Sequence, residues 1–133
     1  MFWDGFRNKY SDVGLLLFRV VFGLAFLLHG LLKFGVGSDL SFGSLPILAQ
    51  VGGIIEVVVG LLVIPGLFTA WAGFIGAGEM AVAYWTGHAF STGSFWNPLS
   101  NGGELAALFA FAFLLLFFLG AGKWSLDAKL RKA

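Results

Sequence analysis

Cysteine is absent from the 133 residues, and charged side chains make up only 11% of them. Without cysteine, the chain by itself has no disulfide, no thiolate metal site and no dithiol redox chemistry. A typical soluble domain has about 25% charged residues, so less than half of the usual charge is present. The formal net charge of +1 points to no nucleic-acid partner.

Apolar residues, in contrast, are abundant. Hydrophobic residues make up 59% of the chain, which includes sixteen Phe and five Trp, and the mean hydropathy is +0.91. A small soluble surface could not hide this bulk. The composition therefore excludes a soluble globular domain, a disordered chain and a fibrous protein, and it leaves an integral membrane protein.

Four apolar stretches are long enough to be transmembrane helices, since one span needs about 20 apolar residues. They cover residues 13–34, 46–64, 67–88 and 101–121, and a short amphipathic tail follows at 122–133. We therefore expect one membrane domain over residues 1–133, an all-α bundle of four transmembrane helices. Arg19 interrupts the first apolar stretch, so we interpret that stretch as a retained span rather than a cleaved signal peptide.

The distribution of Lys and Arg predicts the orientation in the membrane. Positive residues cluster toward the cytoplasm, and with four spans both ends of the chain lie on one side. That side would carry Arg7, Lys9, Lys123, Lys129, Arg131 and Lys132, against Lys33 alone on the other. Both termini are thus expected in the cytoplasm, and the loops at 35–45 and 89–100 are expected outside.

Ionisable side chains within the apolar stretches form the candidate polar site. Its members are Arg19, His29, Lys33, Glu56, Glu79 and Glu104. Small residues such as Gly23, Gly60 and Gly76 share helix faces with these charges, and small residues let helices approach closely. We therefore expect the charged faces to point toward one another inside the bundle.

Pairing is expected because a charge at a helix centre costs about 2.5–3.5 kcal/mol on insertion. Arg19 is the deep cation, so it is expected to pair with Glu56 or Glu79. One interpretation is an ion-pair network that only fastens the bundle. The other is a polar pocket in the outer half of the bundle that holds a ligand, a quinone head group or a proton.

Two further features have simpler interpretations than a ligand site. Asn101 and Glu104 have the spacing of a capping box, with Asn101 as the N-cap of the last span. His29 and His88 are weak candidates for metal or haem ligands, but one His per helix disfavours haem. No Ser/His/Asp set, phosphate loop or metal-ligand spacing is present, so no catalytic residue and no metal site are assigned.

Several short segments, taken in their order and spacing, resemble the DoxX family of small four-helix membrane proteins. They are Arg19, His29-Gly30 with Lys33, Gly53 with Glu56 and Gly60, Gly78-Glu79-Met80, Asn101-Gly102-Gly103-Glu104-Leu105 and Gly122-Lys123-Trp124-Ser125-Leu126-Asp127. The resemblance implies a four-helix bundle in a prokaryotic cytoplasmic (inner) membrane. It also implies a link to redox chemistry, because family members have been connected with a thiosulfate:quinone oxidoreductase and with other membrane redox complexes.

These features favour a small accessory subunit of a larger membrane complex, redox or electron-transport linked, without catalysis of its own. Its partners would be the lipid bilayer and other membrane subunits, which would dock on apolar faces such as residues 105–119. One alternative is a quinone-interacting oxidoreductase subunit with an intramembrane Glu/His proton site, for which quinone would be the cofactor. A further alternative is a small transporter.

Overall fold

The computed structural model describes residues 1–132, with the backbone alone for Asn8. Its regular elements are all helical, and no strand occurs among these residues. The longest helices are α1, α2, α3 and α6, and the short elements connect or extend them. In chain order the elements are α1 (Phe2–Lys33), the 3-10 helix η1 (Phe42–Ser44), α2 (Ile47–Val63), α3 (Thr69–Ala83), the π-helix η2 (Tyr84–Ala89), α4 (Phe90–Thr92), α5 (Pro98–Asn101), α6 (Glu104–Leu119) and α7 (Leu126–Leu130).

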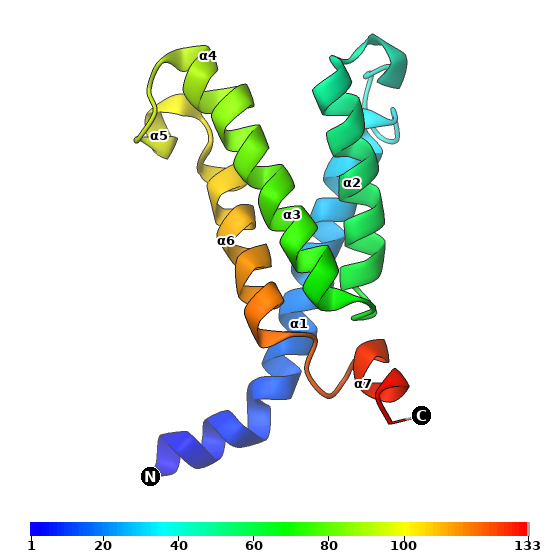
Figure 1. Cartoon of the computed structure of the whole chain (residues 1–133), viewed down its shortest axis with the longest axis vertical. Helices are drawn as coiled ribbons and strands as arrows, with labels where there is room; N and C mark the ends of the chain where they lie inside the picture. The colour runs from blue at the N-terminus through cyan, green and yellow to red at the C-terminus, as the bar shows by residue number, and fades with distance from the viewer. Residues whose placement is uncertain (133) are drawn as a thin grey trace.

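The four long helices form two closely packed pairs. α1 packs along α2, α3 packs along α6, and contacts between α2 and α3 join the pairs (Figure 1). The pairs lie close together at the end where α7 is found and diverge toward the end that carries η1 and α4 (Figure 1). Both chain termini are at the converging end, and the first turns of α1 project away from the bundle (Figure 1).

Glycines allow the helices of each pair to touch through their backbones. A Cβ added at Gly60 would lie 2.8 Å from the Cβ of Leu27 and 2.9 Å from the carbonyl oxygen of Gly23. In the other pair, a Cβ at Gly73 would lie 2.8 Å from the carbonyl oxygen of Phe113. The glycine-lined approach expected from the sequence is therefore present, and any larger side chain at these positions would separate the helices.

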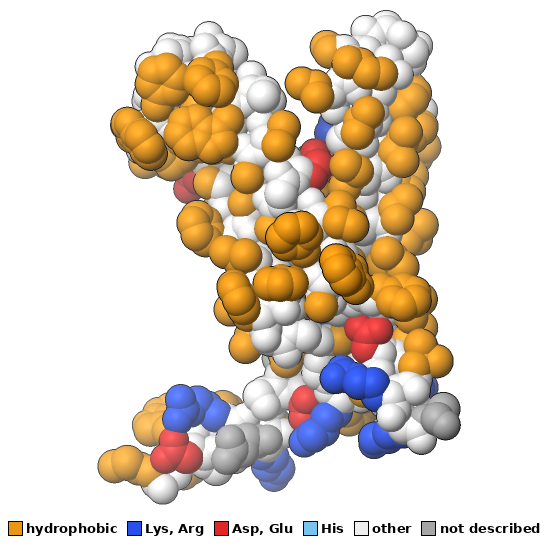
Figure 2. Space-filling view, in the orientation of Figure 1, with side chains coloured by type: hydrophobic (Ala, Val, Ile, Leu, Met, Phe, Trp, Pro, Cys, Tyr) orange, Lys and Arg blue, Asp and Glu red, His pale blue; other side chains and the backbone are white. Residues whose placement is uncertain are grey.

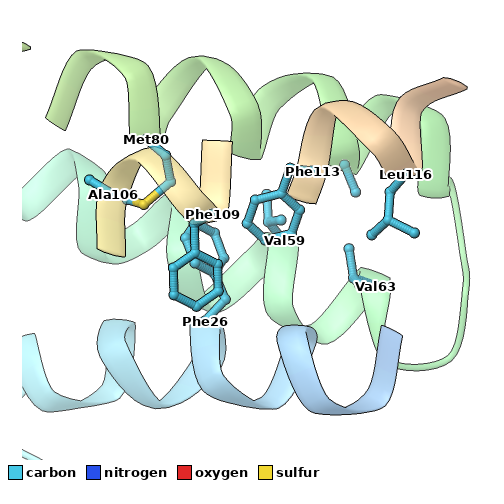
Figure 3. Packing of buried hydrophobic residues seen from close by; sticks show 9 residues of the cluster. Phe26, Val59, Val63, Met80, Ala106, Phe109, Phe113 and Leu116 are labelled. Atoms are coloured by element: carbon cyan, nitrogen blue, oxygen red, sulfur yellow. The ribbon is translucent and has the colours of Figure 1, made fainter. Parts of the chain in front are cut away.

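A core of apolar side chains joins all four long helices (Figure 3). Phe26 of α1 lies against two rings of α6, with centroids 5.4 Å from Phe109 and 4.5 Å from Phe113. Val59 of α2 and Met80 of α3 complete the contact from the other two helices. The two pairs are thus held together by aromatic packing in the middle of the bundle.

Helix lengths differ from the expected spans. Residues Lys9–Lys33 form a 25-residue stretch that is long and apolar enough to cross a membrane, whereas α2 and α6 have 17 and 16 residues. At 1.5 Å per residue the two shorter helices are about 26 and 24 Å long, below the hydrocarbon thickness of about 30 Å. α2 is shorter than expected because Pro46 is its N-cap. α6 is shorter because Asn101 ends the separate helix α5 and Gly103 is the N-cap of α6.

The surface of the bundle is mostly apolar, and charged side chains gather at the converging end (Figure 2). Large hydrophobic side chains stand exposed along the long helices, among them Val21 of α1 and Phe111 and Phe118 of α6. The expected tail contains the short helix α7, with Lys129 in its last turn, and Ala133 lies outside the described residues. An apolar surface of this extent is stable only where lipid or another apolar surface covers it.

Candidate functional site

Three of the predicted residues meet near the diverging end of the bundle, and we refer to Lys33, Glu56 and Glu79 as the cavity cluster. Lys33 is the last residue of α1, and its Nζ donates a hydrogen bond to Oε2 of Glu56 at 2.7 Å. The Glu56 side chain is only 3% exposed, while that of Lys33 is 26% exposed. The carboxylate of this ion pair is therefore buried, whereas the Lys33 side chain is partly accessible from outside the bundle.

Glu79 reaches this pair from α3 because Gly52 on α2 has no side chain. A Cβ at Gly52 would lie 2.9 Å from Oε1 of Glu79 and 3.6 Å from Nζ of Lys33. Oε2 of Glu79 is buried and has no hydrogen-bond partner among the described residues. The cavity cluster has two carboxyl groups and one ammonium group, and among the described residues only Glu56 forms a salt bridge with Lys33. The cluster therefore holds either a surplus negative charge or a bound proton.

Two cavities open onto the cavity cluster. The larger, of about 670 Å³, is lined by Lys33, Glu79 and His88 together with apolar residues of α2 and α3. The smaller, of about 300 Å³, is lined by His29, Lys33, Glu56 and His88. Figure 2 shows an acidic and a basic side chain in the hollow between the two helix pairs. Both volumes fit the range of about 300–1,000 Å³ that is usual for small-molecule sites.

Both histidines border the smaller cavity. The Nδ1 atom of His29 lies 2.8 Å from the carbonyl oxygen of Ala25, within hydrogen-bond distance. His88 lies in the π-helix η2, a wider helical turn that often occurs at functional sites. No group of three or more His, Asp or Glu side chains that would hold a metal ion is found within residues 1–132.

Glu104 lies apart from the cavity cluster, and the predicted capping box is wrong. The N-cap of α6 is Gly103, and the exposed Glu104 is the first residue of that helix. Asn101 instead fastens the preceding turn, because its Oδ1 accepts from the N–H of Gly103 at 2.7 Å and its Nδ2 donates to the carbonyl oxygen of Ser94 at 2.7 Å. The side-chain cap in this region belongs to Asn97, which caps α5.

Arg19 also lies apart, at the converging end, and the predicted pairing with Glu56 or Glu79 is wrong. Its side chain is fully buried, and Nη2 donates to the carbonyl oxygen of Trp124. Among the described residues no carboxylate lies within salt-bridge distance of the guanidinium, and the C-terminal segment that Arg19 bonds continues into α7 with Asp127 in its first turn. The reason is axial distance: Arg19 lies 14 residues before Lys33 on α1, about 21 Å at 1.5 Å per residue, and Lys33 is the cation at the level of Glu56.

Asp127 ties the C-terminal segment to the start of α3. Its Oδ1 accepts from the N–H of Phe68 at 2.7 Å, and its Oδ2 accepts from the N–H of Thr69 at 2.9 Å. The N–H of Asp127 in turn donates to the carbonyl oxygen of Gly66 at 2.9 Å. Asp127 therefore satisfies free N–H groups at a helix N-terminus, where a negative charge is also favoured.

We refer to Arg19, Gly66, Trp124 and Asp127 as the terminal junction. Sequence reasoning did not find its last three members, although the segment Gly122–Asp127 was among those that resemble the DoxX family. The available signal was Asp127, an acidic residue on the same predicted side of the membrane as Arg19. Spacing alone could not show that the tail folds back onto the turn between α2 and α3.

Comparisons with known proteins show the family of the chain. The DoxX family profile matches residues 14–89, which include Arg19 and all three members of the cavity cluster. A Haemophilus influenzae protein described as "Uncharacterized protein" is 41% identical over 131 residues, covering 94% of this chain and 96% of the relative. No solved structure matches at a significant level. On the profile match and on this relative, the chain belongs to the DoxX family of membrane proteins.

Proposed function

We propose that the chain is a multi-pass protein of a prokaryotic cytoplasmic membrane, with α1, α2, α3 and α6 as its four spans and both termini in the cytoplasm. The gathering of charged side chains at the end that carries both termini supports this orientation (Figure 2), since cytoplasmic segments are rich in Lys and Arg. A bilayer accommodates helices as short as α2 and α6 by local thinning, at a modest cost per ångström.

Within this membrane protein, the cavity cluster is a binding and proton-exchange site. The observation that carries the proposal is Oε2 of Glu79, which is buried and has no hydrogen-bond partner in the part of the chain that the structure describes. Glu79 lies near the Lys33–Glu56 ion pair and lines a cavity of about 670 Å³. An ion-pair network with a purely structural role would pair each carboxylate with a cation. A group with a free acceptor atom and access to a cavity can instead take up a proton or bind a hydrogen-bond donor.

A quinone head group is one ligand of this kind, because its hydroxyl and carbonyl groups exchange protons as it is reduced and reoxidised. The protein would supply Glu79 as the proton carrier and Lys33 as a donor to a carbonyl oxygen. The electrons would come from a partner subunit, and the chain would thus act as an accessory subunit of a membrane redox complex.

The outer face of α6 supports the accessory role as a separate observation. Leu108, Phe111, Leu115 and Phe118 are exposed on this helix, and an apolar stripe of this kind can dock another membrane subunit. Extraction in several mild detergents followed by mass measurement of the complex tests this role. Association with other chains is expected, and a lone 14.3 kDa monomer in every detergent would contradict it.

Infrared spectroscopy of the carboxyl groups tests the proton-exchange site. We expect a carboxyl band that changes with pH in the wild-type protein and is lost in Glu79→Gln. Glu104→Gln is the matched control, because Glu104 is exposed on the surface of α6 and lines none of the three cavities described here. A titrating band that survives in Glu79→Gln, or the absence of any such band, would contradict the proposal.

A further inference from the structure

We propose that the cavity cluster binds a lipophilic cation, with Glu79 as its counter-ion and the groove between α3 and α6 as the site for its apolar body. The inference rests on the proposed function, since it uses the same free carboxylate. It goes beyond a neutral quinone head group, because it uses the ionised form of Glu79, gives the ligand a positive charge and states the course that its apolar part takes.

The sign of the charge on the ligand follows from the charged groups of the cavity cluster. Lys33 Nζ is already engaged by Glu56 at 2.7 Å, whereas Glu79 Oε2 has no partner among the described residues. When Glu79 is ionised, two carboxylates against one ammonium group leave a surplus negative charge, which favours a cation and opposes an anion. In an apolar setting with little water, an unpaired charge of this kind has a strong preference for an opposite charge.

The apolar body has a matching groove on the other side of α3. A cavity of about 590 Å³ lies between α3 and α6, and aromatic residues including Trp85, Trp96 and Phe111 line it. The rings of Trp85 and Trp96 meet edge to face, with centroids 5.6 Å apart. Aromatic faces attract cations and pack against aromatic ligands, so this groove suits a positively charged aromatic molecule.

Gly78 connects the two spaces. Phe74 and Gly78 line both the cavity of the cluster and the aromatic groove, and Gly78 immediately precedes Glu79. A Cβ added at Gly78 would have no atom within 4 Å. The surface of α3 is therefore open at this point, and a bound molecule can extend from Glu79 over Gly78 into the aromatic groove.

Binding of two probes of matched size and opposite charge tests the inference on the full chain in detergent. Tetraphenylphosphonium is the cation and tetraphenylborate is the anion, and equilibrium dialysis measures both affinities. We expect tetraphenylphosphonium to bind saturably and to change the tryptophan fluorescence. Loss of the counter-ion in Glu79→Gln should weaken its binding by at least about tenfold, while the Glu104→Gln control should bind as the wild type does.

A second variant keeps the test informative if Glu79→Gln folds poorly. Gly78→Leu leaves every charge in place but fills the passage, so it should weaken tetraphenylphosphonium binding without removing the titrating carboxyl band. Equal affinity for both probes would show partition into apolar surface and would overturn the inference. It would also be overturned by absent tetraphenylphosphonium binding, or by unchanged affinity in both variants. A wild-type carboxyl band that still titrates would then show that the proton-exchange site itself stands.

Discussion

The cavity cluster and the terminal junction both contain charges within the helical bundle, but they differ in the space around those charges. At the cavity cluster, two carboxylates and one ammonium group border cavities of about 670 and 300 Å³. At the terminal junction, the Arg19 side chain is fully buried and its guanidinium donates to the backbone carbonyl oxygen of Trp124. A Cβ at Gly66 would lie 1.8 Å from Arg19 Nη1, so no space remains there for a ligand.

The comparison shows that an ionisable residue within a membrane helix does not by itself mark a functional site. Arg19 and Glu79 are equally unusual in sequence, and each has buried polar atoms without a partner among the described residues. The two residues differ in whether they border a cavity. Arg19 fastens the C-terminal segment to the bundle, whereas Glu79 lines a cavity that a ligand can enter. We therefore expect changes at the terminal junction to affect stability and changes at Glu79 to affect binding.

The largest effect on stability is expected for Gly66→Ala. The added Cβ would clash with Arg19, and the residue has a φ of +72°, so overpacking and backbone strain together should cost about 3–5 kcal/mol. Gly93→Ala is the matched control, because Gly93 has a φ of +73° with no atom within 4 Å of an added Cβ, and strain alone costs about 1 kcal/mol. Thermal unfolding in detergent measures both, and equal losses would show that Arg19 does not pack against Gly66.

A loss of about 3 kcal/mol is expected for Lys33→Met, because the change leaves the buried Glu56 carboxylate without its cation. Glu56→Gln in the same chain removes that charge, so the double variant should be more stable than Lys33→Met alone. A double-mutant cycle measured by thermal unfolding gives the coupling. Strict additivity of the two changes would mean that the Lys33–Glu56 pair is not formed in the membrane protein.

Arg19→Leu is expected to cost about 1–3 kcal/mol, since it removes the buried donor to the Trp124 carbonyl oxygen. The change should be coupled to Asp127→Asn and additive with Glu79→Gln. Two double-mutant cycles in one detergent distinguish these outcomes. Coupling to Glu79 in place of Asp127 would contradict the separation of the two regions.

The smallest loss of stability is expected for Asp12→Asn. Asp12 holds the C-terminal segment to α1, since it accepts from the backbone N–H of Lys123 at 3.0 Å and pairs with Lys123 Nζ at 3.2 Å. The Lys123 side chain is 81% exposed, so water and salt screen the pair. The melting temperature should fall less than in Arg19→Leu. A larger fall would mean that Asp12 rather than Arg19 fastens the segment.

Much of the architecture could be predicted from the sequence. The apolar stretches indicated the four long helices, and glycines beside charges indicated the faces that meet, because both signals depend on residues within one helix. The grouping of Lys33 with Glu56 and Glu79 agrees with the predicted inward faces. These predictions needed only helical periodicity and the cost of an unpaired charge in an apolar environment.

The partners of Arg19 and Asn101 could not be predicted in the same way. Arg19 donates to a backbone carbonyl oxygen 105 residues away. Every residue has a backbone carbonyl, so the sequence does not distinguish the one that is bonded. Asn101 has the spacing of a capping box, but its side chain bonds within the turn that precedes α6. Both cases depend on how a connection folds over the end of a bundle, and connections are less constrained by local pattern than helices are.

Modification by dicyclohexylcarbodiimide tests the central claim, that Glu79 is a carboxyl group able to hold a proton and open to an apolar ligand. This apolar reagent reacts with protonated carboxyl groups and leaves a stable adduct that peptide mass spectrometry locates. We expect one adduct within the helices, on Glu79, its loss in Glu79→Gln, and no adduct on Glu56, which is held as an ion pair by Lys33. An adduct on Glu56 with none on Glu79 would contradict the account.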